Sequence, residues 1–292
     1  MIRTRELLPF VAAALGIAVF STMDALMKSA AIAVGAYSAL LFRSLIGTAL
    51  MLPIWRLGGG RWPGRAARRV HLLRAAVVAG MAWLFFWGLV RIPLAEGIAL
   101  SFIAPLIALF LAAALLGERV RPRALVASLI GLAGVVIIAA ARMGGGYEAD
   151  AAWGVAAVLA SAALYAWNLV LQRQQALLAD PREVALFQHL FVGLLLVAAA
   201  PWLAVMPTAP VLVEIAGAAA LAALALMLLS WAYARAETQA LVAIEYTAFV
   251  WASLMGWLWF AETVTWTTLA GAVCIVAGCW IGAPRRTEQT AL

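Results

Sequence analysis

Charged residues are scarce in this chain of 292 amino acids, where Asp, Glu, Lys and Arg together make up 11%. A soluble globular domain carries about 25% of these residues. Hydrophobic residues reach 67%, and the mean hydropathy is +1.04. No soluble core could bury this excess, so a large soluble domain and a disordered chain are both excluded. We expect an all-α integral membrane protein whose surface mostly faces lipid.

Cysteine and histidine are nearly absent as well. Cys274 and Cys279 fall in one apolar segment, so we expect buried thiols and exclude a disulfide scaffold. His71 and His189 lie in separate apolar segments, and the chain has no HExxH, GxSxG, P-loop or Asp-rich metal motif. We therefore expect neither catalysis nor a bound metal or cofactor. An intramembrane enzyme and a channel stay only as remote alternatives.

Long apolar runs fill the chain instead. A spanning helix needs about 20 apolar residues, and breaks in hydropathy carry turn residues such as Gly58–Gly60 and Asp180–Pro181. The runs predict ten transmembrane helices, at about 9–29, 36–56, 71–90, 94–115, 123–142, 152–172, 183–200, 210–233, 240–260 and 264–283.

The basic residues orient these helices. With the N-terminus inside, 16 of the 20 lysines and arginines fall on the cytoplasmic side, as the positive-inside rule requires. The segment 56–74 alone contributes six of them, the last being Arg74. This segment could bind nucleic acid, but an orientation signal explains it better. We expect a multi-pass protein of the inner membrane with both termini in the cytoplasm. Its expected partners include membrane lipid and exclude nucleic acid.

The chain also carries an internal repeat. A shift of 144 residues aligns polar and glycine positions, and a shift of 145 brings LFRSLIG at 41–47 onto LFQHLFVG at 186–193. The aligned pairs are Asp24 with Asn168, Lys28 with Gln172, Glu118 with Glu262, and Gly134 with Gly278. Two five-helix halves are predicted, at 1–143 and 150–284, followed by a cytoplasmic tail at 285–292. Because five is odd, the halves are inverted in the bilayer, as in alternating-access transporters.

Two stretches resemble the EamA-type repeat of the drug/metabolite transporter superfamily. They are PLAEGIALSFIAPLIALFLAAALLGERV in the segment 93–138 and TQALVAIEYTAFVWASLMGWLWFAETV in the segment 238–281. The resemblance implies a ten-helix transporter of small metabolites, similar to amino-acid exporters of the YddG type. The opening stretch FSTMDALMKSAA also resembles a branch of importers. We expect export of amino acids, including aromatic ones, or similar zwitterions; the alternative is import of a larger metabolite such as S-adenosylmethionine or riboflavin.

Ionisable residues inside spans are functional candidates, because burying them in lipid is costly. Asp24, Lys28 and Arg43 could form a charged cluster that binds the ammonium and carboxylate of a zwitterion. Alternatively, an Asp24–Lys28 or Asp24–Arg43 ion pair simply ties two helices together. Glu245 could bind a substrate amine or carry a coupling proton, or it could be solvated or paired with Arg235.

Polar and aromatic side chains complete the candidate site. Two tryptophans of one span share a face at a spacing of four residues, and an aromatic lining would suit an aromatic substrate. Packing and lipid-facing roles stay open for each aromatic residue. Pro105 predicts a kink one turn after Ser101. The predicted substrate-binding residues are Asp24, Arg43, Trp83, Trp87, Ser101, Tyr165, Asn168, Trp231, Glu245 and Tyr246.

Overall fold

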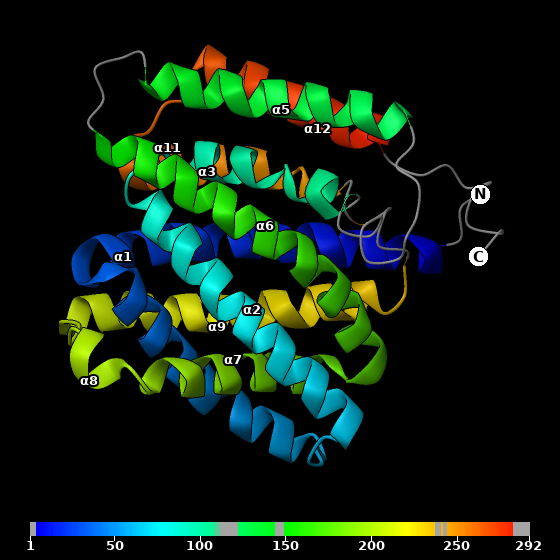
Figure 1. Ribbon diagram of the computed structural model, residues 1–292. Coiled ribbons are helices and arrows are strands. Elements are labelled where there is room, and N and C mark those ends of the chain that lie inside the picture. The colour runs from blue at the N-terminus through cyan, green and yellow to red at the C-terminus, as the bar shows by residue number, and fades with distance from the viewer. Residues whose placement is uncertain are drawn as a thin grey trace.

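The structure is a computed structural model that describes residues 4–108, 110, 122–143, 149–236, 241 and 244–282. These residues are almost entirely helical and contain no strand, which confirms the all-α prediction (Figure 1). Glu118 and the tail at 285–292 lie outside the described residues. The labelled helices are α1 (Thr4–Leu57), α2 (Arg65–Leu89), α3 (Leu94–Ser101), α5 (Pro122–Met143), α6 (Ala149–Leu178), α7 (Pro181–Val197), α8 (Ala200–Leu203), α9 (Ala209–Tyr233), α11 (Ala248–Phe260) and α12 (Trp266–Gly282).

Helix α1 contains the first two predicted spans. Its backbone leaves helical geometry at Gly35, with φ 82° and ψ 151°, a conformation that glycine adopts without steric cost. The helix therefore has two arms, residues 4–34 and 36–57, which diverge in the view of Figure 1. One glycine makes the turn for which the hydropathy pattern predicted a loop between residues 29 and 36.

The fourth predicted span is interrupted near Pro105. Helix α3 ends at Ser101, residues 102 and 103 form a turn, and the chain is helical again from 104 to 108. A proline has no N–H to donate, and its ring clashes with the carbonyl four residues earlier, which here belongs to Ser101. The break confirms the predicted kink. It also leaves the Ser101 hydroxyl bonded to the Gly97 carbonyl at 2.9 Å.

Lipid-facing surfaces dominate the exterior. Within the described part of the chain, four helical segments are long and apolar enough to cross a membrane: Leu7–Leu57, Arg65–Leu89, Asp150–Leu178 and Ala209–Tyr233. Shorter apolar helices cover Leu94–Ala108, Leu125–Ala141, Ala248–Phe260 and Trp266–Gly278. Their exposed side chains include many leucines, valines and tryptophans. Such a surface suits hydrocarbon rather than water.

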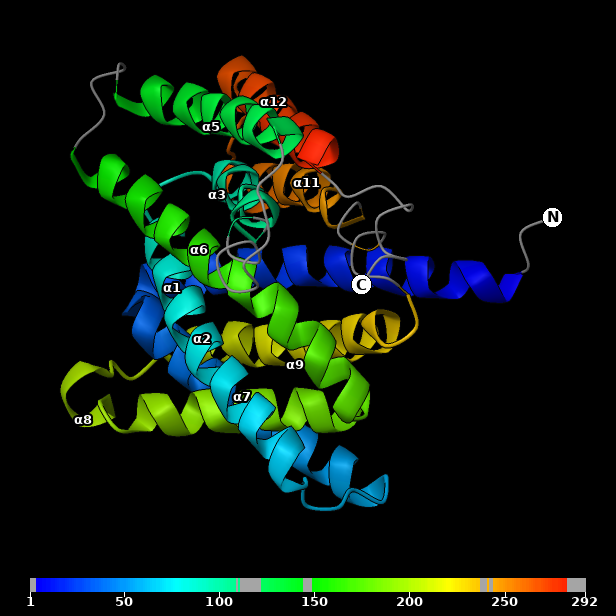
Figure 2. The same cartoon turned by 45° about the vertical axis from the view of Figure 1, so that its right-hand side comes forward.

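If two repeats are related by a shift of 144 residues, a contact between two helices should recur between their counterparts in the other repeat. The helix contacts follow this exchange of counterparts. The first arm of α1 corresponds to α6 in this register, and α2 corresponds to α9. Helix α1 packs on α9, and α2 packs on α6. Helix α3 packs on α11, and α5 packs on α12. In Figures 1 and 2, α5 and α12 lie side by side and run in opposite directions.

The α5–α12 contact shows the same exchange at single residues. A Cβ on Gly134 would lie 2.5 Å from the Gly271 carbonyl oxygen, and a Cβ on Gly278 would lie 2.6 Å from the Ala127 carbonyl oxygen. Residues 127 and 134 become 271 and 278 after the shift of 144. The two contacts are therefore equivalent, and both need glycine because the helix backbones approach so closely.

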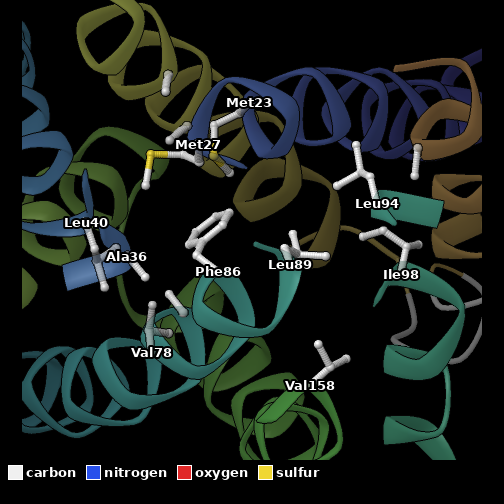
Figure 3. Close-up of a cluster of buried hydrophobic side chains, with 14 of the residues drawn as sticks. Met23, Met27, Ala36, Leu40, Val78, Phe86, Leu89, Leu94, Ile98 and Val158 are labelled. Carbon is white, nitrogen blue, oxygen red and sulfur yellow. The ribbon is translucent and has the colours of Figure 1, made fainter. Parts of the chain in front are cut away.

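The start of α1 and the end of α12 lie on one side of the molecule, and α8 lies on the opposite side (Figure 1). Between these sides, the hydrophobic core surrounds the buried ring of Phe86 in α2. Figure 3 shows this ring between Met23 and Met27 of α1 on one side and Val78 of its own helix on the other. The Phe86 ring belongs to this core and also lines a central cavity.

Candidate functional site

A cavity of about 230 Å³ lies at the centre of the helices. Its walls come from α1, α2, α3, α6, α7 and α9, and from residues 245–248 before and at the start of α11. Six of the ten predicted binding residues line it: Asp24, Arg43, Ser101, Tyr165, Asn168 and Glu245. Both predicted halves contribute, so residues that are far apart in the sequence share one site.

Asp24 and Arg43 face the cavity from the two arms of α1. They interact electrostatically, but no ion pair within 4 Å joins either of them to another described residue. Arg43 instead contacts the Met23 sulfur at 3.5 Å from Nη1, and its guanidinium lies 5.8 Å from the centroid of the Phe86 ring. The predicted Asp24–Arg43 tie between helices is therefore not a direct contact, although both side chains line the same cavity.

Lys28 has a different partner from the one predicted. Its ammonium forms an ion pair with Glu262 and donates to the Ile92 carbonyl at 2.9 Å. The second carboxylate oxygen of Glu262 accepts the N–H of Leu94 at 2.8 Å. The predicted Asp24–Lys28 pair does not form, because Lys28 lies one turn further along α1, where its ammonium binds the α2–α3 and α11–α12 connections instead.

Arg74 is the main site residue that the sequence analysis misplaced. It was assigned to the cytoplasmic basic segment, but it is buried in α2 and lines the cavity. Its guanidinium donates to the side-chain oxygens of Asn168 and Gln172, at 2.9 Å each, and of Gln175. Its position three residues inside the predicted span 71–90 was a signal that could have identified it.

A buried polar network continues from Arg74. The Gln175 amide nitrogen lies 2.5 Å from His71 Nδ1, and His71 Nε2 lies 3.0 Å from a carboxylate oxygen of Glu183. Glu183 stands in the first turn of α7, which Asp180 caps by accepting the Glu183 N–H at 3.1 Å. The network fixes α2, α6 and α7 around the guanidinium of Arg74.

Glu245 is held by two tyrosines. Tyr165 donates its hydroxyl to one carboxylate oxygen at 2.7 Å, and Tyr233 donates to the other. The predicted alternative of an Arg235 partner is wrong, because Arg235 binds the Trp231 carbonyl at 3.1 Å and lies over the Trp231 ring. The tyrosines supply hydrogen bonds but no positive charge, so the carboxylate has no ion-pair partner within 4 Å among the described residues.

Apart from Tyr165, the predicted aromatic residues lie outside the cavity lining. Trp83 is 44% exposed on the outer surface, and the Trp87 ring packs under the Arg91 guanidinium at 3.5 Å. Trp231 packs under Arg235, and Tyr246 contacts the edge of another ring, that of Phe102. The aromatic part of the lining consists instead of Phe20, Phe85, Phe86, Phe102 and Tyr165.

The cavity therefore combines phenylalanine walls with two acidic side chains, Asp24 and Glu245, and two arginines, Arg43 and Arg74. No two of these four form an ion pair within 4 Å. No group of three or more His, Cys, Asp or Glu side chains that could hold a metal occurs in the described part of the chain. Such an arrangement can bind a small molecule that carries both a positive and a negative charge.

Comparison with known proteins agrees with this architecture. The EamA-like transporter family matches the chain twice, at residues 7–140 and 152–282. The pseudopaline exporter CntI of Pseudomonas aeruginosa, from two strains, is 28% identical over 268 residues, which cover 89% of this chain and 90% of the exporter. A solved protein structure with 22% identity superimposes with a TM-score of 0.64 over 93% of this chain and 95% of its own. The chain belongs to the EamA-like transporter family and is a multi-pass inner-membrane transporter.

Proposed function

We propose that this transporter exports a small zwitterionic metabolite, an amino acid or a similar compound, with aromatic amino acids among its substrates. The observation that carries the proposal is the set of four charged side chains in one cavity, two acidic and two basic. An α-amino acid presents one carboxylate and one ammonium. Arg43 or Arg74 can pair with the carboxylate, and Asp24 or Glu245 can pair with the ammonium.

The energetics favour a charged ligand over an empty, dry cavity. A charge inside a membrane protein is costly unless it is paired or solvated. Protein groups pair these four charges only through neutral hydrogen bonds or at a distance, as for Arg74 with three amide oxygens. A zwitterion would supply the missing counter-charges, and the phenylalanine walls would pack on an apolar side chain.

Outward transport is supported by the exporter relative. That protein exports pseudopaline and aligns with 89% of this chain. At 28% identity the cargo need not be the same, so we take from it the direction and not the substrate. The cavity chemistry, rather than the relative, supports an amino acid or similar zwitterion.

We also propose that the two halves, 1–143 and 150–284, are inverted and rock about this cavity, with both termini and the tail 285–292 in the cytoplasm. The exchanged helix contacts support the inversion, and the excess of basic residues on alternate connections supports the orientation. Transport by inverted halves needs no covalent change of the substrate.

Coupling to protons rests on the two carboxylates of the cavity. Asp24 and Glu245 are the acidic side chains that line it. Either one could carry a proton in one direction when the substrate moves in the other. A flux that ignores a pH gradient would remove this role from both.

The test is uptake of radiolabelled amino acids by proteoliposomes, with and without a pH gradient. Unlabelled S-adenosylmethionine and riboflavin are added as competitors. The proposal predicts saturable flux of at least one amino acid, with Asp24→Asn and Arg43→Gln both reducing it while the protein stays folded. The absence of amino-acid flux, or displacement by the larger metabolites alone, would contradict it.

A further inference from the structure

Three buried side chains in the cavity have polar atoms that no described residue of the protein satisfies. They belong to Arg43 of α1 and to the neighbouring Gln188 and His189 of α7, and all three line the cavity. Each residue is at most 8% exposed. Within the described part of the chain, Arg43 Nε, both amide atoms of Gln188 and His189 Nε2 have no hydrogen-bond partner.

Such atoms are expensive to keep. Most buried polar side-chain atoms in proteins have a partner, and an unsatisfied group loses its water without compensation. Here four atoms on three adjacent side chains share the same deficit. A bound molecule with donors and acceptors in matching positions would remove it, which is the usual design of a ligand site.

The local packing holds this group in place. A Cβ on Gly47 would lie 2.4 Å from His189 Nδ1, so the missing side chain at Gly47 is what admits the His189 ring against α1. At the same helix contact, a Cβ added to Gly193 of α7 would lie 3.5 Å from the Ser44 Cβ. The α1–α7 contact therefore holds the His189 ring against α1 at Gly47, one turn from Arg43.

The internal repeat aligns residues of this group with one another. The 145-residue shift of LFRSLIG onto LFQHLFVG aligns Arg43 with Gln188 and Ser44 with His189. The aligned residues hold the same place in the sequence repeat but differ in chemistry. One half supplies a permanent positive charge, and the other supplies a neutral amide with a donor and an acceptor.

We propose that Arg43, Gln188 and His189 form the subsite that binds the α-amino-carboxylate head group of the substrate. This inference rests on the proposed function. The Arg43 Nε–H and the Gln188 amide N–H donate to the carboxylate, and the Gln188 amide oxygen accepts from the ammonium. His189 Nε2 adds a further hydrogen bond to the same head group, and Asp24 supplies the negative charge near the ammonium. Arg74, Glu245 and the phenylalanine walls then contact the rest of the molecule.

The experiment compares L-phenylalanine with two analogues that each lack one charged group. These are phenethylamine, which lacks the carboxylate, and 3-phenylpropionate, which lacks the ammonium. Each is added unlabelled to proteoliposomes that take up radiolabelled L-phenylalanine. A site built to bind both groups should prefer L-phenylalanine to either analogue by about tenfold or more.

The variants are Gln188→Leu and, as a second variant that keeps the charge but removes the Nε donor, Arg43→Lys. Each variant should bind L-phenylalanine about tenfold more weakly than wild type does. Its affinity for phenethylamine should stay within about twofold of wild type, so the preference for a compound with a carboxylate becomes smaller. The matched control is Ser230→Ala, because Ser230 also has a buried unpartnered oxygen but does not line the cavity. It should leave the preference unchanged.

The outcomes separate this inference from the proposed function. If wild type takes up L-phenylalanine and both folded variants keep the wild-type preference over phenethylamine, the subsite is wrong and the function stands. A preference lost equally in Ser230→Ala would also overturn the subsite. If wild type takes up none of the amino acids tested, both proposals fall.

Discussion

The ammonium of Lys28 forms an ion pair with the carboxylate of Glu262, although 234 residues separate them along the chain. Glu262 also accepts the N–H of Leu94, and Lys28 donates to the carbonyl of Ile92. The pair thus joins the first arm of α1, the α2–α3 connection and the α11–α12 connection. It is a direct polar link between the two proposed halves.

Removing one partner of this link should destabilise the fold. Breaking a buried ion pair from one side costs about 3–5 kcal/mol, and we expect the low end because the Glu262 side chain is 19% exposed. Lys28→Met should therefore lower the unfolding temperature of the detergent-purified protein clearly. The double variant Lys28→Met/Glu262→Met should recover part of the loss, since it removes both charges of the pair. Wild-type stability in Lys28→Met would show that the pair contributes nothing.

Gly47 should tolerate no side chain. A methyl group there would overlap His189 Nδ1, so the ring and its helix must shift, at a cost of about 1–3 kcal/mol. Gly47→Ala should lower stability and weaken amino-acid uptake, because the His189 ring leaves its position beside Arg43. Gly193→Ala is the control at the same contact, since its nearest neighbour would be 3.5 Å away. Equal effects of the two changes would contradict this packing.

Arg74 should not be replaceable by lysine. A single ammonium cannot reach the three amide oxygens that the guanidinium binds from three nitrogens. Each lost hydrogen bond to a charged group costs about 1.5–3 kcal/mol. Arg74→Lys should reduce both the unfolding temperature and the uptake rate. Arg69→Lys, at an exposed position of the same helix, should change neither. An Arg74→Lys protein with wild-type uptake would remove Arg74 from the site.

The orientation of the chain can be read from two exposed positions. Leu57 is the last residue of α1 and is 89% exposed, and Met206 follows α8 and is 77% exposed. With both termini cytoplasmic, a membrane-impermeant maleimide should label Met206→Cys from outside intact cells. It should label Leu57→Cys only in inverted vesicles. Both measurements use a background in which Cys274 and Cys279 are alanine. The reverse pattern would invert the proposed topology.

Much of the fold could be predicted, because lipid imposes long apolar helices that hydropathy detects. The sharp turn at Gly35 was not predicted, because a turn made by one residue with positive φ needs no polar loop in the sequence. Asp24, Arg43 and Glu245 could be predicted as residues of the cavity lining, because ionisable residues are rare in apolar spans. Arg74 was missed because it lies near a span boundary, beside arginines that do serve as surface charges.

The aromatic candidates show why the rest of the site could not be predicted. Helices that are apolar on all sides carry no periodic signal that distinguishes the cavity face from the lipid face. Trp83 and Phe85 are two residues apart in α2, yet Trp83 is exposed and Phe85 lines the cavity. The tertiary arrangement of the helices makes that choice, and no local spacing encodes it.

Ligand protection at Ser101 tests most directly whether a zwitterion occupies the central cavity. Ser101 lines the cavity, and its hydroxyl donates to the Gly97 carbonyl in the preceding turn of its own helix. In Ser101→Cys with Cys274 and Cys279 replaced by alanine, a transported amino acid at saturating concentration should slow alkylation of the new thiol. The corresponding amine without the carboxylate should not. Alkylation that proceeds at the same rate with and without the transported amino acid would contradict the account.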